Sequence, residues 1–392
     1  MKTDQHIYLD NNATTRIAPE VFEAMRPFLT DVYGNPSSAH TLGRQMRIAI
    51  ERAREQVAEL LGGSESSEIV FTSCGSESDN WAIRGVLEQH PDKRHIITTR
   101  VEHEAVRILC ERLESNGYEV TWIEVDEQGL LNPDDLRAAL RPDTAIVSIM
   151  LANNETGVLF PMDEIGRIVR EDSNALFHVD AVQAAGKIPI DLSKTAVDLL
   201  AISGHKLHAP AGIGALYIRR GVDLAPMIIG GKQEGGRRAG TSPVPYIVAL
   251  GKACELASDS GAHERIRRLR DHFEDTILDA IPNTRLNGTR DRALRLPNTS
   301  SISFEHIEGE SILAHLDELA IYVSTGSACN SGAHVSSPTL RAMNVPYTAA
   351  QGSIRFSLGR YNTEEEIAYV LDVLPGIIHR LAEMSPYDFK ES

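Results

Sequence analysis

Two short apolar runs each end in a side chain that could do chemistry. The run at 199–202 leads to Lys206, and the run at 176–179 leads to Asp180. Ligands of open α/β sheets bind where strands end, and a partly desolvated lysine there can act as a Schiff-base nucleophile. A fixed carboxylate keeps a heterocyclic nitrogen protonated. The pair predicts a site for an electron-accepting cofactor, although a surface lysine and a helix-capping aspartate are the ordinary alternatives.

A glycine turn supplies a candidate anion site. Gly75 and Ser76 lie between an apolar run at 68–72 and a helical pattern that includes Trp81 and Val86. Unpaired amides at a helix start, together with the helix dipole, favour phosphate. Taken alone, this segment fits an ordinary turn equally well.

One of the four cysteines is placed to react. Cys329 lies in a run of small polar residues that predicts a mobile loop presenting a thiol. Cys110 and Cys254 lie in apolar stretches, as structural cysteines do, and Cys74 is interpreted as a packing residue. The wide spacing of all four favours reduced thiols over a disulfide framework or a metal site.

The elements that must position these residues alternate along the chain. Short strand-like runs and longer helical patterns between about 65 and 220 predict βαβ units and a mostly parallel sheet. An amphipathic helix that reaches Leu60 and ends at Gly62 precedes them. The expected strands are Glu68–Thr72, His95–Thr99, Val120–Val125, Ala145–Met150, Leu176–Val179 and Leu199–Ile202.

A break in the helical pattern suggests a domain boundary. The stretch from about Tyr246 is interrupted at 258–261, and a charged helix follows at 262–280. Thr363 and Glu366 form a capping box before a final surface helix, and residues 385–392 resemble a tail. The expected division is a large domain, 16–260, and a small domain formed by 1–15 with 261–392 that carries the Cys329 loop.

Composition excludes several classes of protein. The chain has 392 residues, 42% of them hydrophobic, which is enough for a large core. The formal charge of −16 makes nucleic acid and anionic membranes poor first ligands. Because the N-terminus shows no signal pattern and no run approaches a membrane span, we expect a cytoplasmic protein.

Together these segments resemble the cysteine desulfurases, a family of fold-type-I, class-V aminotransferase-like enzymes that use pyridoxal 5'-phosphate. The nitrogenase-associated branch is the most similar, followed by the branch for iron-sulfur cluster assembly. The resemblance implies an α/β fold, with a mostly parallel seven-stranded sheet in the large domain and a smaller α+β domain. The matching motifs are Tyr8–Thr15, Gly34–Ser38, Glu102–His103, Asn153–Gly157, Ser203–Lys206, Arg237–Thr241 and Ile354–Arg360.

The resemblance also assigns roles to single residues. Lys206 would hold the cofactor and move protons, Asp180 would pair with the pyridine nitrogen, and His103 would stack on the ring and assist catalysis. Arg355, with Asn154, would bind the substrate carboxylate. The remaining cofactor contacts would come from Gly75, Ser76, Asn154, Gln183, Ser203, His205 and, from the partner subunit of a homodimer, Thr241.

The implied reaction converts L-cysteine to L-alanine and leaves a persulfide on Cys329. A sulfur-acceptor protein would take that sulfur for iron-sulfur cluster assembly or another thiolation pathway. No resident metal is expected, although Cys329 could transiently ligate an iron-sulfur cluster. Direct nucleic-acid or membrane binding is not expected.

Two positions depart from the family pattern, since similar chains have lysine at Ala211 and arginine at Gly235. Three alternatives remain: a catalytically inactive sulfur relay, a nicotinamide oxidoreductase, and another pyridoxal-phosphate enzyme such as a selenocysteine lyase or transaminase. The retained Lys206 and Cys329 disfavour the first. The second lacks a Gly-x-Gly-x-x-Gly turn, and the loop cysteine disfavours the third.

Overall fold

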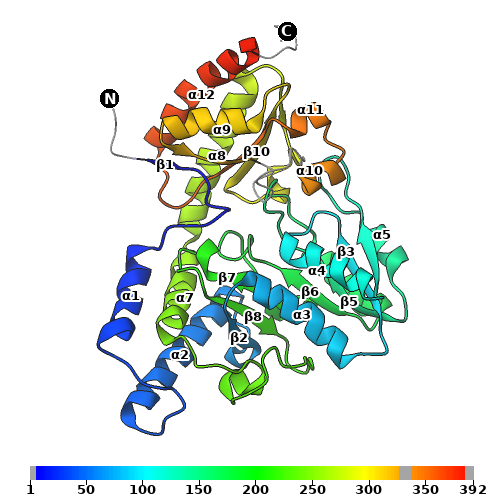
Figure 1. Cartoon of the computed structure of the whole chain (residues 1–392), viewed down its shortest axis with the longest axis vertical. Coiled ribbons are helices and arrows are strands. Elements are labelled where there is room, and N and C mark those ends of the chain that lie inside the picture. Colours follow the sequence, from blue (N-terminus) through cyan, green and yellow to red (C-terminus); the bar gives the residue numbers. More distant parts are fainter. Residues whose placement is uncertain (1–5, 326–336, 385–392) are drawn as a thin grey trace.

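The structure is a computed structural model that describes residues 6–325 and 337–384. Among these, seven strands form the central sheet of the larger, lower part of the molecule (Figure 1). Their order is β2-β8-β7-β6-β5-β3-β4. The strands are β2 (Ile69–Thr72), β3 (His95–Thr99), β4 (Glu119–Ile123), β5 (Thr144–Ser148), β6 (Leu176–Asp180), β7 (Leu199–Ser203) and β8 (Gly214–Ile218).

The predicted parallel sheet is confirmed, with one addition. All neighbouring pairs from β7 through β4 are parallel, and the six expected strands lie within two residues of their predicted bounds. Strand β8, which is not predicted from the sequence, runs antiparallel between β2 and β7. Residues 204–213 separate β7 from β8, and this connection is shorter than the dozen or more residues that a helical crossover needs.

Helices cover both faces of this sheet, as a parallel sheet requires. Ile96 packs in one core with α3 and α4, whereas Ile97 packs in the opposite core with α1, α2 and α7. The predicted helix that ends at Leu60 is α2, and Gly62 follows it with φ +86°. The helices are α1 (Pro19–Thr30), α2 (Thr41–Leu60), α3 (Gly75–Gln89), α4 (Glu104–Ser115), α5 (Pro133–Ala139), α6 (Met162–Asp172) and α7 (Val244–Ala257), with short 3-10 turns η1 (Ser66–Glu68), η2 (Leu192–Lys194), η3 (Gly204–Lys206) and η4 (Gln233–Gly236).

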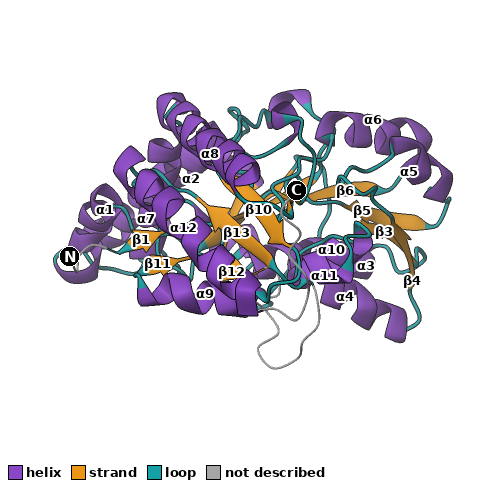
Figure 2. Ribbon diagram, turned by 90° about the horizontal axis from the view of Figure 1, so that it is seen from above, coloured by secondary structure: helices purple, strands orange, loops and turns teal. Residues whose placement is uncertain are grey.

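The smaller part is built on an antiparallel sheet of order β12-β13-β10-β9, and α8, α9 and α12 pack against it or one another (Figure 2). The predicted capping box is present, because Thr363 and Glu366 bond each other's backbone N–H groups. The elements are β9 (Thr284–Leu286), β10 (Thr299–Phe304), β12 (Ser324–Thr325), β13 (Ser353–Ser357), α8 (Ser260–Ala280), α9 (Gly309–Glu318), α12 (Glu364–Met384) and η5 (Arg292–Leu294).

The N-terminal segment belongs to the smaller core although it precedes the larger part. Strand β1 (Ile7–Tyr8) pairs with β11 (Ile321–Tyr322), and Leu9 is fully buried among α8, β10 and β13. The short helices α10 (Pro338–Ala342) and α11 (Tyr347–Ala350) contribute side chains to the larger core. The domain bounds 16–260 and 261–392 stay a prediction. No helix in the described ranges combines the length and apolarity needed to cross a membrane.

Candidate active site

Lys206 and Asp180 lie at the same edge of the central sheet. Strands β6 and β7 are parallel neighbours, with Asp180 opposite Ala201, so the chain brings Lys206 just beyond the end of β7. The amine of Lys206 donates to the backbone carbonyl of Ala13 at 2.8 Å and to that of Asn12. The N-terminal segment therefore covers the edge of the sheet that carries Lys206 and Asp180.

Asp180 is a buried carboxylate with one oxygen in local use. It is 6% exposed, and its Oδ1 accepts a hydrogen bond of 2.9 Å from the Val182 N–H. Burial raises the pKa of Asp180, while His103 and Lys206 act in the opposite direction. A cationic partner at the other oxygen would favour the ionised form further.

Two more buried acids lie near Asp180, and the sequence analysis gave neither of them a role. Burial, followed by the charges of Asp180 and Glu102, raises the pKa of Asp79 well above its usual range. Burial likewise raises the pKa of Glu102 to about 8. Within the described residues, neither Asp79 Oδ1 nor Glu102 Oε2 has a hydrogen-bond partner. Burial therefore favours the protonated form of both carboxyls.

His178 lies beside this acid cluster as a neutral group. Burial lowers the pKa of His178 to about 3, and its Nδ1 hydrogen-bonds Ser148 Oγ at 2.9 Å. Its Nε2 lies 3.5 Å from Asp79 Oδ1 without forming a hydrogen bond. Because the imidazole is uncharged, the two groups do not form an ion pair.

Asn12 accepts hydrogen bonds from several residues of the site, and the sequence alone does not predict these contacts. Its side-chain Oδ1 accepts from Lys187 Nζ at 3.1 Å and from Asn298 Nδ2 at 3.0 Å. Its backbone carbonyl accepts from Gln183 Nε2 at 2.9 Å as well as from Lys206. The motif at 8–15 pointed to this segment, but the bonds come from residues far along the chain.

Arg355 reaches the same segment from β13. Its Nη1 donates to the Asn154 carbonyl at 3.0 Å and its Nη2 to Asp10 Oδ1 at 2.9 Å. The guanidinium is nearly buried, and its Nε has no hydrogen-bond partner in the part of the chain that the structure describes. The smaller part thus supplies a cation to the edge that carries Lys206.

The phosphate site expected from the resemblance fits the local structure. Gly75 is the first residue of α3, and a Cβ there would lie 2.6 Å from Val182 Cγ2 and 3.5 Å from Ser203 Cβ. Ser203 Oγ is buried and, among the described residues, lacks a hydrogen-bond partner. An unpaired hydroxyl beside the start of a 15-residue helix suits a phosphate oxygen, so these residues fit pyridoxal phosphate.

The other expected cofactor residues differ in how close the structure brings them. His205 Nδ1 bonds Thr14 Oγ1 at 3.2 Å, and burial followed by the charge of Lys206 lowers the pKa of His205 to about 4. His103 caps α4, with its Nδ1 accepting from Ala105 N–H at 3.2 Å. Ser76 and Thr241 are exposed, and no hydrogen bond among the described residues joins Thr241 to the phosphate site.

Three cysteines can be placed. Burial raises the pKa of Cys254 to about 12 and that of Cys110 higher still, so both thiols are structural. Cys74 does more than pack, because it caps α3 and its Sγ accepts from Glu77 N–H at 3.4 Å. Cys329 lies outside the described residues.

The two family departures occur in turns. Gly235 has φ +67°, a left-handed conformation that costs glycine little and other residues more. Ala211 is exposed in the turn before Gly212, and nothing in the structure explains the missing lysine.

Comparison with known proteins agrees with this geometry. Residues 7–370 match the family model described as Aminotransferase class-V. A cysteine desulfurase of Trichormus azollae is 56% identical over 388 residues, covering 98% of this chain and 96% of that protein. Cysteine desulfurase NifS of Azotobacter vinelandii is 49% identical over 383 residues, covering 97% and 94%.

A solved structure named NIFS-like protein superposes with a TM-score of 0.90 at 41% identity, covering 96% of this chain and all of that one. The fold class and family expected from the motifs are therefore confirmed. The chain belongs to the aminotransferase class-V family and, within it, to the pyridoxal-phosphate-dependent cysteine desulfurases.

Proposed function

We propose that the chain takes sulfur from L-cysteine, releases L-alanine and carries the sulfur as a persulfide on Cys329. One observation carries the proposal. Lys206, from the larger part, donates to the carbonyls of Asn12 and Ala13 at the edge of the sheet where β6 ends in Asp180. Arg355, from the smaller part, donates to Asp10 and to Asn154 at the same edge. A nucleophilic amine, a carboxylate clamp and a buried acid therefore share one site.

Pyridoxal phosphate, when bound, supplies an electron-accepting ring for the substrate amine. Lys206 would hold the cofactor covalently, and Asp180 would face its ring nitrogen with the oxygen that Val182 does not use. His103 would cover the ring face. Gly75, Ser76, Ser203 and His205 would surround the phosphate, while Gln183 and Asn154 would lie near the ring oxygen.

Substrate recognition would depend on Arg355. Its fork already donates to Asp10 and Asn154, so the substrate carboxylate would share or replace these acceptors. Once displaced, Lys206 would carry protons to and from the substrate Cα. The arrangement favours an amino acid over a substrate that lacks the carboxylate.

The sulfur transfer balances without a further reagent. The Cys329 thiolate would form a bond to the substrate sulfur, and the Cβ–S bond would break with its electron pair passing to the carbon side. Protons delivered to Cβ and Cα would complete alanine. The persulfide would then pass to an acceptor protein for iron-sulfur cluster assembly or another thiolation pathway.

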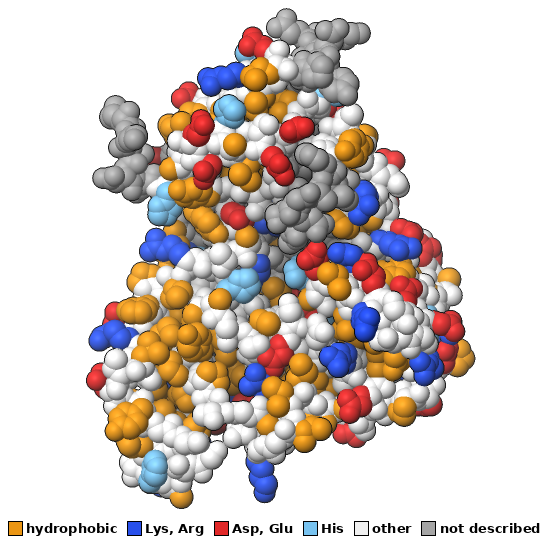
Figure 3. Space-filling view, viewed as in Figure 1, with side chains coloured by type: hydrophobic (Ala, Val, Ile, Leu, Met, Phe, Trp, Pro, Cys, Tyr) orange, Lys and Arg blue, Asp and Glu red, His pale blue; other side chains and the backbone are white. Residues whose placement is uncertain are grey.

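Exposed apolar side chains support the proposed homodimer. Figure 3 shows hydrophobic side chains gathered over α1 and α2. Exposed large hydrophobic residues in this region are Ile17, Phe22, Leu29, Tyr33, Leu42 and Ile48. Such a patch on a charged surface marks an interface, and a second subunit would supply Thr241 of the partner subunit to the phosphate. We also propose a cytoplasmic location, where thiols stay reduced.

The test compares Cys329→Ser with Cys74→Ser, which keeps a capping side chain at the start of α3. Each protein is mixed with L-cysteine and a reductant, and alanine, sulfide and the cofactor spectrum are followed in one sample. We expect Cys329→Ser to bind cofactor and cysteine but to form no alanine, whereas Cys74→Ser stays active. Alanine formation by Cys329→Ser at the parent rate would refute Cys329 as the sulfur carrier.

A further inference from the structure

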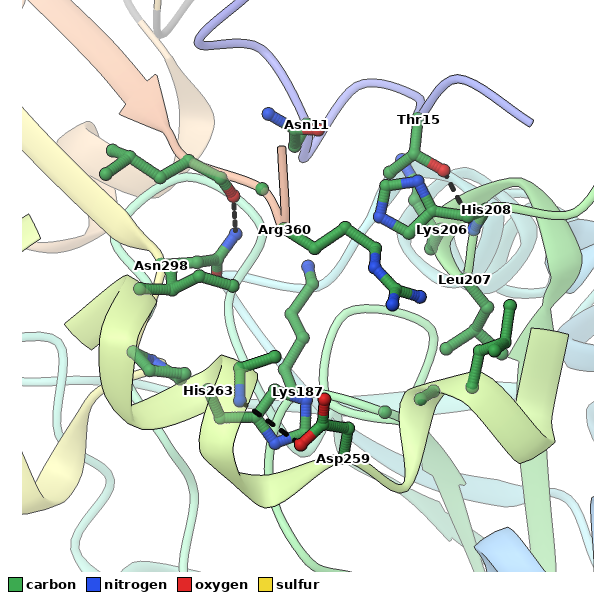
Figure 4. A pocket seen from close by; sticks show the side chains of 18 residues that line it. Asn11, Thr15, Lys187, Lys206, Leu207, His208, Asp259, His263, Asn298 and Arg360 are labelled. Carbon is green, nitrogen blue, oxygen red and sulfur yellow. Dashed lines mark hydrogen bonds between the residues drawn. The ribbon is translucent and has the colours of Figure 1, made fainter. Parts of the chain in front are cut away.

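A second lysine lies near Lys206 and has no role in the proposed reaction. Lys187 lines a pocket of about 60 Å³ between the two parts of the molecule, and Lys206 lines the same pocket (Figure 4). Lys187 Nζ donates to Gln183 Oε1 at 2.7 Å and to Asn12 Oδ1 at 3.1 Å. Both acceptors are amide oxygens.

The surroundings of Lys187 favour a neutral amine. Burial, followed by the charges of Lys206 and Arg355, lowers the pKa of Lys187 well below its usual value. No ion pair of Lys187 is found in the described ranges, and two N–H donors satisfy both amide oxygens without a charge. The other titratable or charged groups that line the pocket or act electrostatically on this region are His205, His208, Asp259, His263 and Arg360.

These bonds fix which way the Gln183 amide points. The Asn12 carbonyl can only accept, so Gln183 must present Nε2 to it, at 2.9 Å. Lys187 holds the opposite atom, Oε1, at 2.7 Å. If this donor is lost, Oε1 loses its hydrogen bond, and only the Asn12 carbonyl still opposes rotation of the amide.

We propose that Lys187 is a positioning residue that orients the Gln183 amide, so that its NH₂ group faces both Asn12 and the cofactor ring oxygen. This inference rests on the proposed function, which places Gln183 beside that oxygen. The remaining N–H of Gln183 stabilises negative charge on the ring oxygen. Because burial disfavours the charged form of Lys187, it places less positive charge than an arginine would next to the nitrogen that joins Lys206 to the cofactor.

The test is the pH midpoint at which the bound cofactor changes its absorbance, measured without substrate. Lys187→Met removes both donors, so the ring oxygen loses support and the nearby nitrogen holds its proton more tightly. We expect the midpoint to rise by about one pH unit. Lys187→Arg keeps donors but adds a permanent cation, which repels that proton and lowers the midpoint.

Two further variants keep the test decisive. Gln183→Leu should reproduce the rise, and the Gln183→Leu/Lys187→Met double variant should add less than the sum of both because the residues act through one contact. Lys194→Met removes an exposed lysine as the control. If Lys187→Met fails to fold, the downward shift in Lys187→Arg and the rise in Gln183→Leu still distinguish a positioning role for Lys187 from a packing role.

The outcomes separate the two levels of inference. Opposite shifts in Lys187→Met and Lys187→Arg support the positioning role. Unchanged midpoints, or shifts in one direction accompanied only by a lower melting temperature, overturn it and leave Lys187 a packing residue. A parent protein that shows no cofactor absorbance instead refutes the proposed function.

Discussion

Two clusters of ionisable side chains, one basic and one acidic, meet at the candidate active site, and they are stabilised in different ways. The basic region consists of Lys187, Lys206 and Arg355, and each side chain donates to carbonyl or amide oxygens. The acid cluster consists of Asp79, Glu102 and Asp180. Within the described residues, two of its carboxyl oxygens have no hydrogen-bond partner.

The difference follows from the chemistry of the two kinds of group. A cation can be held in a protein interior by backbone carbonyls, which are abundant, and Lys206 and Arg355 use three of them. A carboxylate that is buried with few donors loses its hydration, so burial raises its pKa. The site therefore places fixed donors on one side and, on the other, acids whose protonated form burial favours.

The largest expected effect comes from deleting a cation of the basic region. Lys206→Ala would remove the proposed cofactor attachment and proton carrier, so alanine formation should fall at least about a thousandfold. Borohydride reduction and peptide mapping should label Lys206 in the parent and no residue in the variant. Lys194→Ala, at an exposed lysine, is the control. A label on another lysine of the parent would contradict the assignment.

The next effect tests whether the acid cluster is protonated. Glu102 has a folded-state pKa of about 8 against 4.5 in the unfolded chain, so the neutral form stabilises the fold below pH 4.5. This stabilisation is lost as pH rises through 8, and the parent should lose a few kcal/mol of unfolding free energy.

Glu102→Gln has no proton to lose there and keeps an oxygen for Met150 N–H and Thr99 Oγ. Urea unfolding at pH 6 and pH 8.5 should therefore show a smaller decrease than in the parent. Glu124→Gln, at an exposed ion pair, should behave as the parent does. An equal decrease in Glu102→Gln would mean that Glu102 is already ionised at pH 6.

The smallest expected effect tests the geometry of the basic region. Arg355→Lys keeps the charge but loses the fork, so the KM for cysteine should rise about tenfold with a smaller change in kcat. Asp10→Asn keeps an acceptor for Arg355 while removing a competing anion, so its KM should stay the same or fall. Steady-state kinetics of alanine formation measure both, and an unchanged KM in Arg355→Lys would exclude the clamp.

The sequence predicted the parts of the site that lie at strand ends. Lys206 and Asp180 follow apolar runs, and such runs have a clear pattern because the sheet is buried on both faces. The helix that ends at Gly62 was equally clear, since the glycine conformation marks the end. Strand β8 is as long as its neighbours, but it returns antiparallel to β7 and so falls outside the alternation of strands and helices that predicts the others.

The remaining site residues depend on contacts that a local pattern does not encode. Lys187 resembles a surface lysine, and only its apolar neighbours at 184–190 hint otherwise. Asp79 lies in the second turn of a helix, where a carboxylate is ordinary. Both become functional candidates only once Asn12 or Asp180 is brought beside them by the fold.

The N-terminal segment also sets the order in which the enzyme can be completed during synthesis. Asn12 leaves the ribosome early, yet the Ser357 hydroxyl to which its N–H donates lies 345 residues later. Arg355, the partner of Asp10, likewise lies 345 residues later in the chain. A nascent chain that already contains Lys206 therefore still has an open site, and a chain cut short before β13 cannot close it. Recognition of the substrate carboxylate by Arg355 would therefore be the last part of the site to form.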